Sequence, residues 1–172
     1  MEIYLMQHGL ALSEEEDPER PLSSAGKVQI EKSAAAIRMM GLQFDVIIAS
    51  TKKRSKQTAE IVAKVIEYHI ESIVETETIK PSASPGSSLE FIGQFKQKNS
   101  VLIAGHLPSL AKIASMLLTQ ESEVAIQFEN GGLCRIDVKT LPAHDGILRW
   151  YLTPEQLALI STAPHERIRV SL

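Results

Sequence analysis

Two histidines each stand one residue beyond a segment that reads as a buried strand. His8 follows the apolar run 2–6, and His106 follows the run 100–104. An imidazole nitrogen can act as a nucleophile or a base, and ligands of open α/β sheets bind at the carboxyl ends of the strands. Gly9 follows the first histidine and would let a ligand approach the backbone closely. The two histidines are therefore candidates for one reactive site.

A third junction carries positive charge. The segment 50–58 follows the predicted strand 44–49 and contains Arg54. If the strands are parallel, all three junctions open on one edge of the sheet, and His8, Arg54 and His106 surround one crevice. Helix amino termini and a guanidinium offer the donors and positive charge that a phosphoryl group needs. The pattern predicts an anion pocket in which a histidine attacks phosphorus.

The elements that must hold these residues alternate between strand and helix along the chain. Strands are predicted at 2–6, 44–49, 70–74, 100–104, 124–128, 133–138 and 147–152. Helices are predicted from Ser23 or Ser24 to Gly41, after a cap at Ser50 or Thr51, over 88–96, from Pro108, and after Thr153. This order predicts one three-layer α/β/α domain with a mostly parallel central sheet. We expect the domain to span 1–160 and a C-terminal tail to span 161–172.

Composition excludes several classes of protein. The chain has 172 residues, a net charge of -3 and 44% hydrophobic residues, which suits one globular domain. No basic run offers a track for nucleic acid, and no apolar run approaches the roughly 18 residues of a membrane span. A single cysteine, Cys134, excludes an internal disulfide and argues against a zinc–thiolate cluster. Because a strand is predicted from residue 2, we expect no signal peptide. The expected class is therefore a cytoplasmic enzyme or binding domain.

Three separated motifs, in this order, resemble a known family. They are a strand followed by His8-Gly9, then Ser50-xxx-Arg54-xxx-Thr58, then Gly105-His106-Leu107-Pro108. Together they resemble the histidine phosphatase superfamily, whose fold is phosphoglycerate mutase-like. The short length and the Gly-His-Leu-Pro element look most like its small bacterial phosphohistidine phosphatases. The resemblance covers roughly residues 1–157, because the segment from Trp150 also resembles the closing strand and helix of the family.

The resemblance implies a role for each residue. His8 would attack phosphorus and carry the phosphoryl group transiently, Arg54 would hold the phosphoryl oxygens, and His106 would stabilise their developing charge. Gln7 and Gly9 would complete the phosphate-binding set. Neither metal nor other cofactor is implied. The substrate would be a histidine-phosphorylated signalling protein, such as a histidine-containing phosphotransfer domain, rather than nucleic acid or a membrane.

Gln7 departs from the family pattern, which has arginine before the nucleophilic histidine. Glutamine offers a neutral amide where arginine would make a charged, bidentate contact. A hydrogen bond to a charged group contributes about 1.5–3 kcal/mol, and loss of an oxyanion donor costs roughly 10²–10³ in rate. We expect impaired catalysis, unless Lys52, Lys53 or Lys56 compensates. The alternative function is a phosphate- or phosphoprotein-binding module.

Two further alternatives concern the chemistry. A metal hydrolase built on His8 and His106 lacks an obvious carboxylate ligand at either junction. A phosphatase for serine or threonine phosphate would need a general acid, and Glu77 is better explained as a surface residue. A P–N bond tolerates that lack, because imidazole leaves more readily than an alkoxide. The short loop 80–88 leaves little chain for a lid, which favours a protein-borne substrate.

Overall fold

The computed structural model describes residues 1–120 and 124–163. Its six-stranded sheet has the order β3-β2-β4-β1-β5-β6. The strands are β1 (Glu2–Gln7), β2 (Val46–Ser50), β3 (Val74–Thr76), β4 (Ser100–Gly105), β5 (Leu133–Asp137) and β6 (Ile147–Leu152). The first four lie parallel to one another, while β5 pairs antiparallel with both β1 and β6. The predicted mostly parallel sheet is confirmed.

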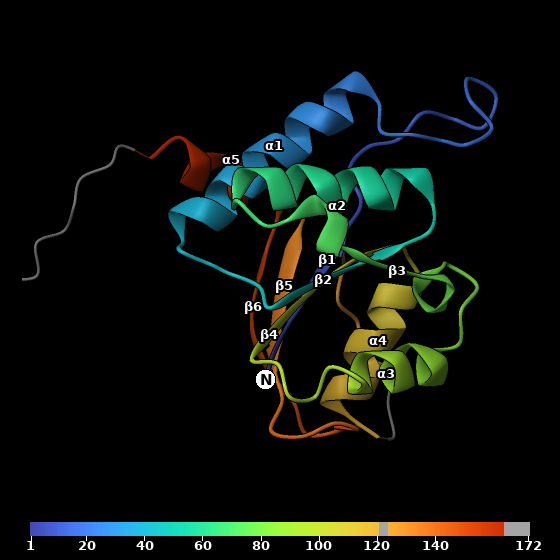
Figure 1. Ribbon diagram of the computed structural model, residues 1–172, viewed down its shortest axis with the longest axis vertical. Coiled ribbons are helices and arrows are strands. Elements are labelled where there is room, and N and C mark those ends of the chain that lie inside the picture. The colour runs from blue at the N-terminus through green and yellow to red at the C-terminus, as the bar shows by residue number, and fades with distance from the viewer. Residues whose placement is uncertain (121–123, 164–172) are drawn as a thin grey trace, which may run out of the picture.

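Helices cover both faces of the sheet (Figure 1). They are α1 (Ser24–Met39), α2 (Lys53–Val65), α3 (Pro85–Gly93), α4 (Ser109–Leu118) and α5 (Pro154–Ser161). One apolar core lies between the sheet and α1, α2 and α5, and a second lies between the sheet and α3 and α4. This is the predicted three-layer α/β/α arrangement. No helix in residues 1–120 and 124–163 has the length and apolar content that a membrane span requires.

The ends of two helices follow from local sequence signals. The Ser23 hydroxyl accepts a hydrogen bond from the Gly26 N–H at the start of α1, and Gly41 takes a φ of 69° beyond its end. Thr153 and Gln156 form a reciprocal capping box on α5. These boundaries agree with the prediction, because each depends on residues that are close in sequence.

Several predicted elements shift in the first half of the chain. The side chain of neither Ser50 nor Thr51 caps α2, which starts after Lys52 without a side-chain cap. The predicted strand 70–74 is a 3-10 turn (Ile70–Ser72) followed by β3, so strand pairing begins only at Val74. The helix expected over 88–96 is α3, which begins at Pro85. Ser84 caps this helix, and the connecting loop shrinks to residues 80–84.

The strand expected over 124–128 is wrong. Residues 124–128 have no regular secondary structure. The N–H and carbonyl of Val124 instead pair with the Ser115 hydroxyl on α4, at 2.9 and 3.2 Å. A side chain from a neighbouring helix thus satisfies groups that a strand would have paired. Of the expected tail 161–172, Ser161 closes α5 and residues 164–172 lie outside the described residues.

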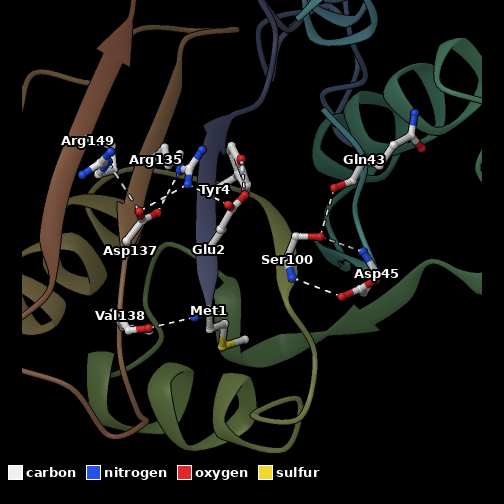
Figure 2. A network of polar contacts seen from close by, with 10 residues as sticks. All are labelled: Met1, Glu2, Tyr4, Gln43, Asp45, Ser100, Arg135, Asp137, Val138 and Arg149. Carbon is white, nitrogen blue, oxygen red and sulfur yellow. Dashed lines mark hydrogen bonds and ion pairs between the residues drawn. The ribbon is translucent and has the colours of Figure 1, made fainter. Parts of the chain in front are cut away.

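A polar network ties the sheet together where β1 begins (Figure 2). Arg135 on β5 reaches Glu2 at 2.6 Å and Asp137 at 2.8 Å. Glu2 and Asp137 lie opposite each other on neighbouring strands. The Tyr4 hydroxyl donates to Glu2 at 2.6 Å. The guanidinium therefore offsets repulsion between two facing carboxylates, a structural role at the end of β1 remote from His8.

Candidate active site

The parallel strands bring the predicted residues to one edge of the sheet. β1, β2 and β4 run parallel and end at Gln7, Ser50 and Gly105. The rings of His8 and His106, which follow β1 and β4, have centroids 4.9 Å apart. Arg54, in the first turn of α2, donates from Nε to Nε2 of His8 at 3.0 Å. The crevice predicted from the strand order therefore exists.

Hydrogen bonds define the tautomer of His8. Its Nδ1 lies 2.8 Å from the carbonyl oxygen of Gly9. A carbonyl only accepts, so Nδ1 carries the hydrogen, and Nε2 holds the lone pair that accepts from Arg54. The nitrogen that faces the guanidinium is therefore the nucleophilic one.

Neighbouring groups hold the His8-Gly9 backbone. The side-chain amide of Asn130 donates to the His8 carbonyl at 2.8 Å. The Gly9 N–H donates to the Thr58 hydroxyl at 3.2 Å, and that hydroxyl donates to the Arg54 carbonyl at 2.8 Å. A Cβ on Gly9 would lie 2.6 Å from Cγ1 of Ile30. Glycine is thus needed for packing against α1, and its N–H and C=O position His8.

Burial keeps His8 neutral. It lowers the pKa of His8 to about 4, and the Arg54 charge lowers it further as a smaller cause. Desolvation is therefore the main reason why the ring stays neutral. At neutral pH the lone pair on Nε2 is therefore available for attack.

His106 is almost wholly enclosed, with 1% of its surface exposed. Neither ring nitrogen has a hydrogen-bond partner among the described residues. Burial first, and then the nearby His8 and Arg54, lower its pKa to about 3. A buried polar group without a partner is costly, so the ring is suited to a ligand oxygen that accepts its N–H.

Gln7 ends β1 half-buried beside these groups. Its Oε1 is buried and has no partner in the part of the chain that the structure describes. Of the lysines considered as compensation, Lys53 pairs with Glu19, and Lys56 pairs with Glu75 at 2.8 Å. The Lys52 side chain makes no ion pair or hydrogen bond with a described residue.

Glu77 lies just beyond β3, near this edge, but is not poised as an acid. Lys80 donates to its carboxylate at 2.5 Å, and the Thr51 hydroxyl donates at 2.7 Å. These bonds, with that from Lys80 the larger cause, lower the pKa of Glu77. The carboxyl is therefore ionised at neutral pH, which agrees with its interpretation as a surface residue.

Three contributors were not predicted as part of the site: Arg20, Asn130 and the positioning hydroxyl of Thr58. Arg20 lies in the loop between β1 and α1, outside the predicted site, yet it lines a cavity together with Arg54. Asn130 lies between the predicted strands 124–128 and 133–138, and only the antiparallel pairing of β5 with β1 brings this segment to the edge. Thr58, four residues after Arg54, is the one for which helical spacing offered a signal.

A cavity of about 600 Å³ adjoins the two histidines at Arg54, the predicted site residue that lines it. It is lined by Glu14, Pro18, Glu19, Arg20, Thr51, Lys52, Lys53, Arg54 and Lys56. Cations outnumber carboxylates on this wall, which suits a dianionic phosphoryl group. Within residues 1–120 and 124–163, no three His, Cys, Asp or Glu side chains are grouped as metal ligands would be.

Comparisons with known proteins agree with this fold. The model of the histidine phosphatase superfamily (branch 1) matches residues 3–78. A structure of the protein histidine phosphatase SixA complexed with tungstate superposes with a TM-score of 0.81 and 21% identity, covering 91% of this chain and 99% of that one.

Two relatives are similar in sequence. An uncharacterized protein of Picosynechococcus sp. is 26% identical over 139 residues, which are 77% of this chain and 82% of that protein. The serine/threonine-protein phosphatase Pgam5 of Drosophila ananassae is 33% identical over 82 residues, 47% of this chain, and the match spans only 28% of that longer protein. The family model thus matches the segment that carries His8 and Arg54, and the SixA structure shares the fold of this chain.

Proposed function

We propose that this chain is a metal-independent phosphohistidine phosphatase of the cytoplasm, and that its substrate is a histidine-phosphorylated signalling protein such as a histidine-containing phosphotransfer domain. The observation that carries the proposal is the His8 ring, whose Nδ1–H donates to Gly9 and whose Nε2 faces Arg54. A neutral, oriented imidazole beside a guanidinium is what phosphoryl transfer to nitrogen requires.

The reaction has two steps. Nε2 of His8 attacks phosphorus while the P–N bond of the substrate breaks. The departing imidazole takes the bonding electron pair, and a proton on its second nitrogen lets it leave as a neutral ring. Nδ1 of His8 keeps its hydrogen, so Gly9 stabilises the cationic phospho-imidazole by accepting a hydrogen bond. Water then attacks phosphorus, the P–Nε2 bond breaks, and inorganic phosphate leaves.

Two features favour a P–N bond over a P–O bond. The ionised Glu77 has no proton to give to an alkoxide. The loop from residue 80 to residue 84 is short, and α3 behind it packs into the core beside α4, which leaves little chain there to close over a small substrate. Both features support a phosphoryl group that is presented on the surface of another protein.

The test is phosphate release from a phosphorylated histidine-containing phosphotransfer domain, with chelator present. The native chain should turn over, and His8→Ala should lose more than roughly 10³-fold in rate because the nucleophile is gone. The variant of an exposed histidine, His69→Ala, is the matched control and should keep full activity. A phosphoserine peptide of matched sequence should be hydrolysed far more slowly.

Other outcomes select the alternatives. Turnover that appears only in Gln7→Arg, with phosphate bound by the native chain, would identify a binding module. Activity lost to the chelator would identify a metal hydrolase. Faster release from the phosphoserine peptide would identify a P–O phosphatase. If no folded variant released phosphate, the proposal would be rejected.

A further inference from the structure

The cavity wall carries five cations, and their partners differ. These are Arg20, Lys52, Lys53, Arg54 and Lys56. Lys53 and Lys56 are neutralised by Glu19 and Glu75. Among the described residues, Arg20 pairs with no carboxylate, and its side chain makes one hydrogen bond, from Nε to the Leu12 carbonyl at 3.4 Å. The two terminal nitrogens of its guanidinium are therefore free to bind an anion.

The backbone around Arg20 is firmly held, although the residue itself is exposed. Its N–H donates to the Asp17 carbonyl at 2.8 Å, and its φ of 49° is left-handed, which is uncommon for a residue other than glycine. Two residues later, the Leu22 N–H donates to the Gln57 side chain at 2.7 Å. Gln57 follows Arg54 by three residues on α2, so the loop returns to the helix that carries Arg54.

The electrostatics of the site agree with this position. The Arg20 charge helps to lower the pKa of His8, Arg54 and His106, in each case as a smaller cause than burial. Lys52 contributes at His106 and lies beside the ionised Glu77. Among the cations of the cavity that were not predicted as site residues, Arg20 is thus the one whose charge affects the pKa of all three residues.

We propose that Arg20 supplies the second guanidinium of the phosphoryl pocket, replacing the arginine that the family pattern has at position 7. The inference rests on the proposed function of this site. Gln7 presents a neutral amide, whereas the free end of Arg20 can bind two phosphoryl oxygens at once. The guanidinium of Arg54 on α2 and that of Arg20 in the loop then bind the negative phosphoryl oxygens together. In the family pattern, the arginine at position 7 would take the place of Arg20.

The test is a double-mutant cycle on the full chain, with tungstate as an oxyanion probe and calorimetry as the readout. The four proteins are the native chain, Arg20→Gln, Gln7→Arg and the double variant. Arg20→Gln should weaken tungstate binding about 10- to 100-fold, as loss of a charged hydrogen bond implies. In the Gln7→Arg background the same change should cost less than about threefold, because the motif arginine is restored.

Two controls sharpen the cycle. Lys56→Gln removes one charge from the same wall, but that charge is already paired with Glu75. It should change tungstate binding less than about threefold. Lys52→Gln tests the competing cation. A loss on Lys52→Gln that vanishes in the Gln7→Arg background would assign the compensation to Lys52 and overturn the proposal.

The remaining outcomes are also decisive. No loss on Arg20→Gln, or an equal loss in both backgrounds, would contradict compensation, provided that thermal melts show each variant folded. Phosphate release from the phosphorylated protein should follow the same cycle. Because tungstate binding needs no turnover, failure of the phosphatase assignment would leave the binding cycle interpretable, and the two failures are distinguishable.

Discussion

At the scale of single residues, the chemistry depends on a few hydrogen bonds around His8. The Gly9 carbonyl selects its tautomer, and Asn130 and Thr58 hold the backbone on which that carbonyl sits. Burial then removes the competing protonated form. The same burial leaves His106 neutral, and its ring nitrogens have no hydrogen-bond partner among the described residues. Positive charge therefore comes from arginine, and the histidines act as neutral rings.

The protonation of His8 can be observed directly. On titration by NMR from pH 8 downward, its ring should keep the signature of a neutral imidazole with hydrogen on Nδ1 until the pH approaches about 4. Arg54→Gln should raise this midpoint only modestly, because burial is the larger cause. A midpoint near the ordinary value of about 6.5, or a full return to it in Arg54→Gln, would contradict the assignment of causes.

At the scale of elements, the loop between β1 and α1 is closed at a narrow neck. The Ser23 N–H donates to the Leu10 carbonyl at 3.0 Å, and the Leu12 N–H donates to the Pro21 carbonyl at 2.9 Å. Gly26, on the first turn of α1, lets the Leu10 backbone approach that helix. The neck positions the loop that carries Arg20. The close approach of the Leu10 backbone to α1 therefore shapes the cavity that Arg20 lines.

Gly26→Ala tests the neck, because its new Cβ would lie 1.9 Å from the Leu10 carbonyl oxygen. We expect the free energy of unfolding to fall by about 1–3 kcal/mol, as overpacking against backbone implies. Gly93→Ala on α3 is the matched control, since nothing lies within 4 Å of its added Cβ. It should be neutral or stabilising by up to about 1 kcal/mol in urea denaturation. Equal effects of the two substitutions would refute the close approach at Gly26.

At the scale of the whole molecule, one sheet separates two apolar cores, and the site lies at the sheet edge between them. That position makes the site deep enough to desolvate two histidines. Stability and catalysis are therefore linked, since the folded protein must keep both rings neutral.

This linkage predicts a pH-dependent stability. The unfolded chain binds protons on both histidines near pH 6.5, while the folded chain does so only near about 4 and 3. The free energy of unfolding is therefore not reduced by these histidines above pH 6.5. It falls as the pH drops toward 4, by up to about 1.4 kcal/mol per pH unit for each histidine. His106→Gln should reduce this slope in urea titrations at several pH values. His69→Gln, which removes an exposed imidazole, is the control, and an unchanged slope in His106→Gln would contradict the linkage.

The sequence by itself determined the layered fold and the placement of three candidate site residues at one edge of the sheet. Strand periodicity, strand-to-helix order and the rule that parallel strands end on one edge were enough to bring His8, Arg54 and His106 together. Local signals were also sufficient at α1 and α5, where a capping side chain lies within three residues of its partner. They failed at 124–128, because the competing partner, Ser115, comes from another element.

Only the tertiary structure decided which side chains gather around the candidate site. Arg20 reaches the cavity because a loop folds back onto α2, and Asn130 reaches His8 because β5 runs antiparallel to β1. The tautomer of His8 depends on a carbonyl oriented by that same packing. Residue spacing encodes helical faces and strand ends, but it does not encode where a long loop returns, since that depends on contacts between segments remote in sequence.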